Sequence, residues 1–392
     1  MTSIVVTLGL ALLAAQGEAP IRQVATREAL QDALRSAGPG TTIRIAPGVY
    51  RGGLTASGRA GTADRPIVIT AADPKRPPVI RDGGTAFYLS NVAHLVISDL
   101  EIEQMSGNGL NIDDGGRGDT PTHHITLQRL VVRDVGPRGN HDGIKLSGVT
   151  DFKVEACRLE RWGEGGSGID MVGCQRGEIV GCTFRHGDDR GDNGVQAKGG
   201  SREIAIRGCL FEHSGQRAVN LGGSTGIAFF RPRPEGHEAR DLLMEDCTVI
   251  GSAAAVAFVG VDGSVVRRNT FVNPRRWVFR ILQETRAPGF VPCRNGKFVD
   301  NLIVFRSGEL ATPVNVGDAT APETFELKGN AWYCSDAPDR SRPRFAAPLK
   351  EAEGIYGVEP SFVDAAKGDF RLRPGGKLQG VGASPVRAGA KP

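Results

Sequence analysis

The chain has 392 residues, of which 54 are glycine, and only 6% of its residues are aromatic. Its 48 basic and 44 acidic residues leave a net charge of +4, without the runs of Lys or Arg typical of nucleic-acid-binding proteins. The glycines do not recur at every third position, and no apolar stretch of about 18 or more residues follows the N-terminus. A collagen, a nucleic-acid-binding protein and a membrane-spanning protein are therefore not expected, and a turn-rich fold with thin, repeated strands is favoured.

Residues 1–19 carry the pattern of a secretory signal peptide. An apolar run extends from Ile4 to Ala15 and is followed by small residues, and it is too short to remain as a membrane span. The residues before the run include no Lys or Arg, which leaves the apolar start of a cytoplasmic chain as the alternative. We expect a secreted or periplasmic protein, for which seven cysteines is an unusual, odd count.

Residues 26–38 predict a short amphipathic helix. Thr26 stands at the N-cap position and Gly38 at the C-cap position, and the apolar residues between them share one face. Residues 41–54 then begin a series of strands. Because the open end of a stacked-coil fold needs a cover, we expect this helix to be the N-terminal cap.

One short pattern recurs along the chain: an apolar strand, then a small, Cys or Asn residue, then a further apolar pair. It is found at residues 97–102, 127–132, 154–159, 179–184, 206–211, 244–249, 266–271 and 299–304. Its central residue repeats at intervals of 22 to 38, as expected for coils whose loops vary in length while their strands stay constant. The central residues are Leu100, Leu130, Cys157, Cys182, Cys209, Cys247 and Asn269.

A second strand follows in each coil and opens with a small residue in most coils. It is found at residues 108–113, 142–147, 167–172, 193–198, 217–222, 254–259 and 276–281. Because side chains alternate along a strand, its apolar positions must face one core. These positions are Leu110, Ile144, Ile169, Val195, Val219, Val256 and Val278, followed two residues later by Ile112, Leu146, Met171, Ala197, Leu221 and Phe258.

Two strands per coil, stacked coil upon coil, predict an all-β, single-domain solenoid, a right-handed parallel β-helix. We expect the coils, with the cap helix at 26–38, over residues 20–318. Residues 319–392, where the repeat blurs and Pro and charge increase, are expected to form an irregular C-terminal cover of the same domain.

The narrow core of such a solenoid suits small side chains. We expect four of the seven cysteines to form an internal stack of thiols that act as small hydrophobic groups. These four are Cys157, Cys182, Cys209 and Cys247. Cys293 and Cys334 could form a disulfide in an outer loop, and Cys174, just after a strand, has no interpretation.

The residues between the buried ones of the second strand must point outward. One outward row is Asn111, Lys145, Asp170, Gln196 and Asn220; its neighbour is Asp113, Ser147, Val172, Lys198 and Gly222; and Asn108, Asp142, Ser167, Asn193 and Arg217 precede them. Further on, the rows become apolar, as Ala257 and Phe279 in one and Val259 and Ile281 in the other. Since the polar cluster is confined to residues 140–222, we interpret it as a site, the alternative being a solvated face held by salt bridges.

The same coils carry long polar loops at residues 136–143 and 185–194. Loops on a rigid solenoid commonly build sites, and carboxylate oxygens are the ligands that Ca²⁺ prefers. Asp188, Asp189 and Asp192 could bind Ca²⁺ together with Asp142 and Asp170. The spacing matches no EF-hand loop, and the alternative is that these residues serve only in turns.

Three regions of the chain carry a resemblance to known proteins. Residues 28–54 and 61–71 resemble the N-terminal cap and first coils of the secreted alginate lyase and chondroitinase B family. The coils NHDGIKLSG (140–148), GSGIDMVG (166–173) and DNGVQAKGG (192–200) are similar to the catalytic coils of the pectate lyase group, and residues 357–376 to a tail common to many such proteins. The resemblance covers most of the chain and implies a right-handed parallel β-helix polysaccharide lyase.

The resemblance also implies roles for individual residues. NGVQAKGG places Lys198 where the alginate lyase and chondroitinase B family has its base, with Arg217 as the nearest match to an arginine of the following coil. Gly191 and Asn193 stand where that family has glutamate ligands for Ca²⁺. In the pectate lyase pattern, DGIK instead makes Lys145 the base, with Asp142 and Asp170 as Ca²⁺ ligands.

The activity that follows is β-elimination on a uronic-acid polymer such as alginate, pectate or a glycosaminoglycan. A cation neutralises the substrate carboxylate, and a lysine whose pKa is lowered removes the C5 proton. We expect catalysis by Lys198 or Lys145 with Arg217, substrate contacts from Gln196, Asn220, His141 and His213, and Ca²⁺ on Asp142, Asp170, Asn193 and Asp189. The expected partner is an acidic polysaccharide, and we expect a monomer.

Three other functions use the same residues differently. A glycoside hydrolase would need two carboxylates, which Asp170 and either Asp188 or Asp189 could supply. An epimerase would need a second acid, which His141 or His213 could supply. A carbohydrate-binding or structural β-helix would use the face without chemistry.

Overall fold

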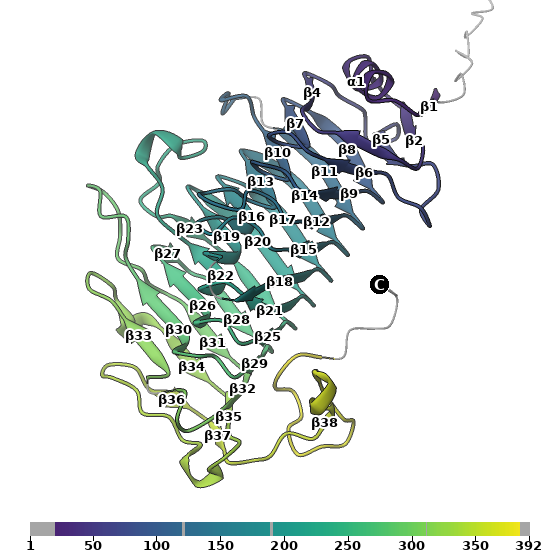
Figure 1. Ribbon diagram of the computed structural model, residues 1–392. Coiled ribbons are helices and arrows are strands. Elements are labelled where there is room, and N and C mark those ends of the chain that lie inside the picture. Colours follow the sequence, from purple (N-terminus) through teal and green to yellow (C-terminus); the bar gives the residue numbers. More distant parts are fainter. Residues whose placement is uncertain (1–19, 120–121, 189–190, 311, 385–392) are drawn as a thin grey trace, which may run out of the picture.

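The chain forms a long parallel β-helix capped by a helix at its N-terminal end (Figure 1). The computed structural model describes residues 20–119, 122–188, 191–310 and 312–384, so the predicted signal peptide lies outside the described residues. Within them, three parallel sheets run the length of the molecule, and each strand pairs with its equivalent in the next coil. The predicted right-handed parallel β-helix is confirmed.

Sheet A lies on one side of the solenoid. It consists of β1 (Ile21–Val24), β2 (Thr42–Ile45), β5 (Ile67–Ala71), β8 (Ala93–Ser98), β11 (Thr122–Gln128), β14 (Val149–Glu155), β17 (Gln175–Val180), β20 (Ser201–Arg207), β24 (Leu243–Glu245), β28 (Val265–Arg267), β31 (Lys297–Val299), β34 (Glu326–Lys328) and β36 (Glu351–Ala352), with β23 (Ala239–Arg240) and β27 (Val261–Asp262) off this path.

Sheet B follows sheet A within each coil. It consists of β3 (Val49–Arg51), β6 (Val79–Arg81), β9 (Glu101–Glu103), β12 (Val131–Arg133), β15 (Arg158–Glu160), β18 (Thr183–Asp188), β21 (Leu210–Ser214), β25 (Thr248–Ile250), β29 (Thr270–Val272), β32 (Leu302–Phe305), β35 (Ala331–Cys334) and β37 (Ile355–Tyr356).

Sheet C contains the strands that the sequence placed second in each coil. It consists of β4 (Leu54–Ser57), β7 (Phe87–Ser90), β10 (Leu110–Asp113), β13 (Ile144–Ser147), β16 (Ser167–Val172), β19 (Asn193–Lys198), β22 (Arg217–Gly222), β26 (Ala254–Val259), β30 (Trp277–Leu282) and β33 (Val314–Val316). A small antiparallel pair, β38 (Phe362–Asp364) and β39 (Asp369–Leu372), lies near the C-terminus.

Each coil has three strands, not the two that the sequence pattern predicted. The recurring segments are bent, because the residue before each central position adopts a left-handed backbone conformation that turns the chain from sheet A into sheet B. Ala156 (φ 52°) ends β14 in this way, and β15 begins two residues later. The bend residues are Asp99, Arg129, Ala156, Gly181, Gly208, Asp246, Arg268 and Asp300.

The central residues form a buried ladder just after the bend. The predicted thiol stack is confirmed, since Cys157, Cys182, Cys209 and Cys247 are all buried and unpaired. The ladder then continues in asparagine. The Asn301 side chain accepts hydrogen bonds from the Asn269 backbone N–H and Nδ2, both at 3.0 Å, and donates one to Asn330 Oδ1 at 3.0 Å. Amides replace thiols in the last coils and satisfy the buried backbone there.

The two ends differ in detail from the predictions. The cap helix α1 spans Arg27–Arg35 with Thr26 as N-cap, as predicted, but Ser36 rather than Gly38 is the C-cap. Beyond residue 318, where an irregular cover was expected, β34 to β37 still extend sheets A and B. The helical coils therefore extend into the predicted C-terminal cover.

The disulfide considered for Cys293 and Cys334 is not formed. All seven cysteines lie within the described residues and are unpaired and buried. The backbone of Cys293 forms an isolated parallel β-bridge with Thr320. Cys334 ends β35 in sheet B, and its Sγ lies 3.3 Å from Asp336 Oδ1. Among the residues that the structure describes, no helix is long and apolar enough to cross a membrane.

The asparagine ladder makes a prediction about stability. Asn301→Ala should lower the free energy of unfolding by about 3 kcal/mol, because it leaves buried N–H and C=O groups of adjacent coils without partners. Cys182→Ala, in the same ladder, should cost only about 1 kcal/mol, because it removes mainly weak thiol contacts and a small volume. Urea unfolding of both variants tests this, and equal losses would contradict it.

Candidate active site

The side of sheet C that faces away from the core carries one continuous row of side chains. Parallel pairing places Lys145 opposite Asp170. Gln196 follows on the next coil, and Asn220 on the one after that. Because neighbouring strands lie about 4.8 Å apart, these four predicted site residues share a patch of four coils. The whole row is Thr55, Tyr88, Asn111, Lys145, Asp170, Gln196, Asn220, Ala257, Arg280 and Asn315.

The predicted end of this row is wrong. In β30 the residue paired with Val256 is Phe279 rather than Val278, so Phe279 belongs to the core and Arg280 takes the outward position. A shift of one residue exchanges the two faces of a strand. The polar row is therefore longer than predicted and continues past Ala257 with a cation.

Two lysines and two buried carboxylates form the centre of the site. The ammonium group of Lys145 contacts the carboxylate of Asp170 and lies 3.4 Å from Asp142 Oδ2. Lys198 reaches the same carboxylate from the other side, with its Nζ 3.8 Å from Asp170 Oδ1. Asp170 and Asp142 are only 1% and 2% exposed, so their charges depend on these lysines.

The chain holds Asp142 tightly between adjacent coils. Its Oδ1 accepts a hydrogen bond from the Ser167 N–H at 2.7 Å, and its own N–H donates to Asn108 Oδ1 at 2.8 Å. Burial, and then the negative charge of Asp170, raise the pKa of Asp142 to about 6 against the opposing effect of Lys145. Asp142 is therefore held in a fixed position in the wall of the site, where its ionised form is destabilised by burial.

The two lysines differ in how firmly they are held. Burial alone would lower the pKa of Lys145, but the charges of Asp170 and Asp142 outweigh it and raise that pKa above its ordinary value. Lys145 is therefore a persistent cation. Lys198 makes only the single, longer contact with Asp170, and its side chain is 17% exposed.

A bulge beside the site shapes the space around Lys198. The pairing of β19 with β22 shifts by one residue after Gln196, so that Ala197 lies opposite Gly222. Gly222 has φ 87°, and a Cβ there would lie 1.9 Å from the Val259 carbonyl oxygen, so only glycine fits. The next residue is also glycine. A Cβ on Gly223 would lie 3.1 Å from Lys198 Cδ, so its absence leaves room for the lysine side chain.

Arg217 approaches the site from the next coil. It donates hydrogen bonds to Asn220 Oδ1 at 3.2 Å and to Glu284 Oε1 at 2.7 Å. Loss of hydration raises the pKa of Asp192, although the positive charge of Arg217 opposes the rise. Sequence reasoning missed Glu284, because it lies 67 residues from Arg217 in a loop outside the repeat.

Polar oxygens without partners lie on β16 and β19. Asn193 donates from Nδ2 to Gln196 Oε1 at 3.2 Å and to Ser167 Oγ at 3.4 Å, but its buried Oδ1 has no hydrogen-bond partner among the described residues. Within the same part of the chain, the buried Asp170 Oδ1 also has none. Such orphaned oxygens mark a place where a donor group of a ligand would be stabilised.

Two predicted residues, His141 and His213, lie at the margins of this cluster, and a third lies outside the described residues. His141 directly precedes Asp142 and is partly exposed. His213 lies in β21 of sheet B, where Gly251 of the following coil packs against its ring. Asp189 lies outside the described residues.

The donor set does not fit a calcium ion shared by Asp142 and Asp170. Both carboxylates contact the ammonium group of Lys145, so a cation held by both would have to displace it. Two positive charges a few ångströms apart in this buried setting would repel strongly. The position of Lys145 therefore argues against the calcium site that the sequence predicted on these two carboxylates.

Cationic and aromatic groups extend the site along the solenoid. The guanidinium groups of Arg276 and Arg280 each lie 4.3 Å from the centre of the Trp277 ring. Arg280 also donates to Asn315 Oδ1 at 2.9 Å. In the other direction, Tyr88 is 45% exposed two coils before Lys145. An elongated ligand with negative charge would find contacts along this row.

The chain belongs to the right-handed β-helix family. The model described as a right handed beta helix region matches residues 79–230 and 120–301, which together make up more than half of the chain. These matches include every strand that contributes to the cluster around Asp170. A search of curated protein sequences found no match.

Solved structures of carbohydrate-active enzymes share this fold. An alginate lyase from Paenibacillus sp. str. FPU-7 is 17% identical with a TM-score of 0.55, over 77% of this chain and 99% of that one. The pectate lyase Pel9A is 14% identical with a TM-score of 0.56, over 95% and 93%. The A-module of the Azotobacter vinelandii mannuronan C-5 epimerase AlgE4 is 15% identical with a TM-score of 0.52, over 84% and 90%. At such identities the likeness concerns the fold.

The raised pKa of Asp142 predicts a pH dependence of stability. The carboxyl binds its proton more tightly in the folded chain than in the unfolded one, so its stabilising contribution is present below about pH 4 and is lost as the pH rises through about 6. Asp142→Asn keeps the acceptor for Ser167 and removes this titration. Between pH 4 and pH 7 the variant should gain up to about 3 kcal/mol relative to the native chain in urea unfolding. A difference that does not change with pH would contradict this.

Proposed function

We propose that the protein is a polysaccharide lyase that cleaves an acidic, uronic-acid-containing polysaccharide by β-elimination. The observation that carries the proposal is that Lys145 and Lys198 contact the buried Asp170 from neighbouring coils, with Arg217 on the coil after that of Lys198. The fold, shared with lyases of alginate and pectate, supports it. An acidic chain lying along sheet C would meet these cations in succession.

In the proposed reaction, the positive side chains first hold the uronate carboxylate next to the bond to be broken. Arg217 is suited to this because its guanidinium has five N–H donors, so its contacts with Asn220 and Glu284 leave others for the substrate. Because these positive side chains neutralise the carboxylate, the pKa of the C5 proton falls. Lys198 takes that proton, the C5 electron pair forms the C4–C5 double bond, and the C4–O4 bond breaks as the O4 group leaves.

We assign the base to Lys198 rather than to Lys145. A base must present a neutral amine, and the raised pKa of Lys145 keeps it an ammonium between two carboxylates. Lys145 then fixes the position of Asp170, whose other oxygen faces Lys198 at 3.8 Å. In this proposal Lys145 is a positioning residue and Lys198 the catalytic one.

The remaining predicted contacts concern the sugar hydroxyl groups. Gln196 and Asn220 occupy the same outward row and could hydrogen-bond hydroxyl groups of successive sugar units. His141 and His213, at the edges of the cluster, are proposed as further contacts. Secretion, which would bring the enzyme to an extracellular polysaccharide, stays part of the proposal.

The other functions find less support in the geometry. A hydrolase would need Asp170 as a free acid or base, but its carboxylate contacts Lys145. An epimerase would need a second acid opposite the base, and His213 lies on sheet B rather than sheet C. A binding protein without catalytic activity would use the same cationic side chains, so only an assay of the products can separate it from a lyase.

Incubation with alginate, pectate and dermatan sulfate tests the proposal. A lyase creates unsaturated sugar ends, which absorb ultraviolet light, and we expect this absorbance with at least one of the three polymers. Lys198→Ala should lower kcat/KM at least about 100-fold while substrate binding persists, because only the proton transfer is removed. Lys297→Ala, an exposed lysine of β31 outside the site, should keep full activity.

The alternatives give different outcomes in the same assay. New reducing ends without the absorbance would indicate a hydrolase, and retained binding without products would indicate a binding protein. If Lys198→Ala stays active, Lys145→Ala is the next variant, and activity in both would make the base assignment wrong.

Metal removal gives a further prediction. Because the ammonium of Lys145 already lies between Asp142 and Asp170, treatment with EGTA should leave lyase activity unchanged. The measurement is the initial rate of absorbance increase before and after treatment. Loss of activity that Ca²⁺ restores and Zn²⁺ does not would show that a calcium site exists after all.

A further inference from the structure

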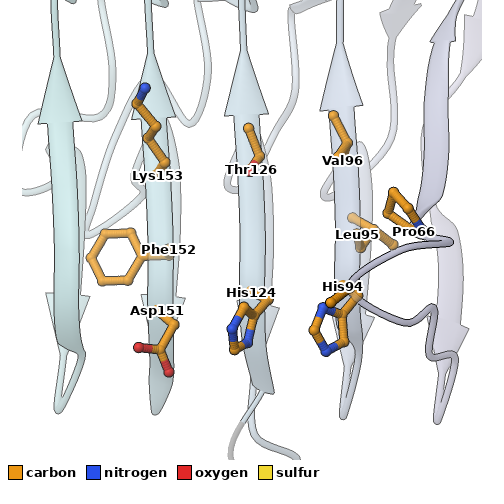
Figure 2. A pocket seen from close by; sticks show the side chains of 10 residues that line it. Pro66, His94, Leu95, Val96, His124, Thr126, Asp151, Phe152 and Lys153 are labelled. Carbon is orange, nitrogen blue, oxygen red and sulfur yellow. The ribbon is translucent and has the colours of Figure 1, made fainter.

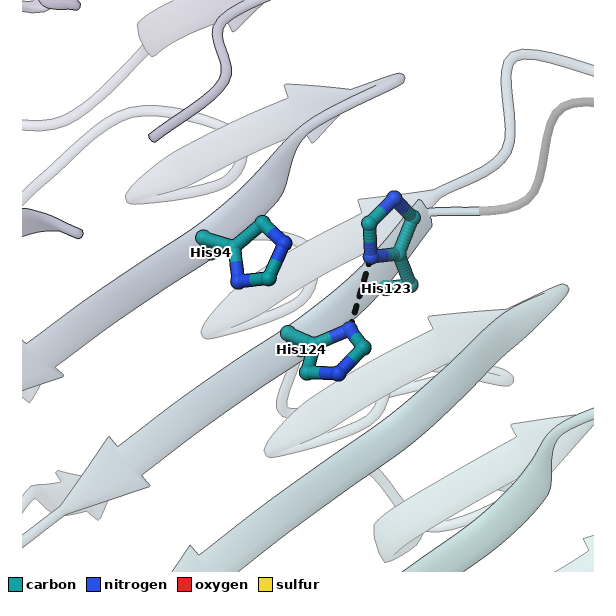
Figure 3. Close-up of side chains that lie close together, drawn as sticks. All are labelled: His94, His123 and His124. Atoms are coloured by element: carbon teal, nitrogen blue, oxygen red, sulfur yellow. Dashed lines mark hydrogen bonds between the residues drawn. The ribbon is translucent and has the colours of Figure 1, made fainter. Parts of the chain in front are cut away.

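Three histidines gather on sheet A, on a different sheet from the site described above. His94 lies in β8, and His123 and His124 lie in the adjacent strand β11 (Figure 3). One ring nitrogen from each can be chosen so that all three lie within 4.8 Å of one another. Among the described His, Cys, Asp and Glu residues, this is the only group of three that meets this distance.

The backbone brings the three rings together in an unusual way. Consecutive residues of an ordinary strand point to opposite faces, yet His123 Nδ1 lies only 2.8 Å from His124 Nδ1. The reason is that His124 has φ 55°, and His94 on the neighbouring strand has φ 48°. These left-handed positions are costly for most residues. The rings of His94 and His124 then stack at 4.4 Å.

The surroundings leave the cluster open on one side. A cavity of about 390 Å³ lies against His94 and His124 and is also lined by Asp151, Phe152 and Lys153 (Figure 2). Asp151 occupies the same row on the next coil, but Arg176 holds its carboxylate with two hydrogen bonds of 2.8 Å. The carboxylate is therefore already paired, and water from the cavity can reach the imidazoles.

We propose that His94, His123 and His124 bind one divalent transition-metal ion of the Zn²⁺ type, with water as the fourth ligand. Three imidazole nitrogens and an open position make a donor set that suits Zn²⁺, whereas Ca²⁺ and Mg²⁺ prefer oxygen. Tetrahedral ligands at about 2.0–2.1 Å from zinc lie about 3.4 Å apart. The separation within 4.8 Å can close to this value, and the 2.8 Å contact can open to it, by rotation of the rings, which also ends the stacking of His94 on His124.

The short contact between two of the rings agrees with this role. Since it joins His123 Nδ1 to His124 Nδ1, one nitrogen must accept, so at least one of the two rings presents a lone pair that a metal ion can bind. The ion would join two adjacent coils of sheet A, a structural role that does not depend on the proposed lyase activity.

Calorimetric titration of the metal-stripped full-length protein with ZnCl₂ tests the proposal. The protein must carry no polyhistidine tag. We expect one equivalent of Zn²⁺ to bind saturably and to raise the Tm. When Co²⁺ is used instead, we expect the visible absorption bands of tetrahedral Co²⁺. His94→Asn and His124→Asn, which suit positive φ, should each weaken binding on the order of tenfold or more, and the double variant should abolish it.

The matched control is His213→Asn. This histidine also has positive φ, at 44°, but lies in sheet B away from the three, so the variant should bind Zn²⁺ as the native chain does. The Tm of each variant without metal shows whether it has kept its fold. The proposal is overturned if the native chain shows no saturable binding, if the double variant still binds, or if the control loses binding equally.

Discussion

The parallel pairing of each strand with its equivalent in the next coil is the constraint on which the rest of the molecule depends. It stacks like positions of successive coils at a spacing of about 4.8 Å, so a side chain's nearest neighbours are set by register rather than by sequence distance. Lys145 and Asp170 are 25 residues apart, and so are Asp151 and Arg176, yet both pairs are in contact. The thiol and amide ladder and the polar row of sheet C are consequences of this rule. The same rule places His94 beside His124 on sheet A.

The rule also explains how the site keeps buried charge. Asp142 and Asp170 would be expensive to desolvate alone, and the stacked coils supply the compensating groups, which are Lys145, Lys198 and the backbone N–H of Ser167. The surrounding backbone is equally specified, since Gly222 sits in a bulge that no larger residue fits. A rigid wall of this kind holds charged groups in fixed positions, as the proposed β-elimination would require for electrostatic stabilisation of its charged intermediate.

Much of this was predictable from the sequence, and the errors have physical causes. The repeat predicted the fold, the thiol stack and the row from Lys145 to Asn220, because alternation and stacking act at every coil. It gave two strands per coil instead of three, because the bend at residues such as Ala156 depends on a left-handed backbone that many residue types adopt here. It placed Phe279 instead of Arg280 outside, because β30 carries apolar residues at consecutive positions and so hides its register. Glu284 and the three histidines escaped it, because they lie outside the repeated motif.

The row of left-handed residues that contains His94 and His124 continues along sheet A as Asp151, Arg176 and Glu203. Its charge alternates over these three coils, where Asp151 and Arg176 are joined by two hydrogen bonds, and the next position in the row is Asp241. A solenoid of interchangeable coils could gain or lose one without penalty. Here, removal of the coil that contains Arg176 would bring the carboxylates of Asp151 and Glu203 side by side, and duplication of a neighbour would separate an ion pair. This ion pair therefore favours one order of these coils, and as a partly exposed pair it contributes far less to that order than the buried core does.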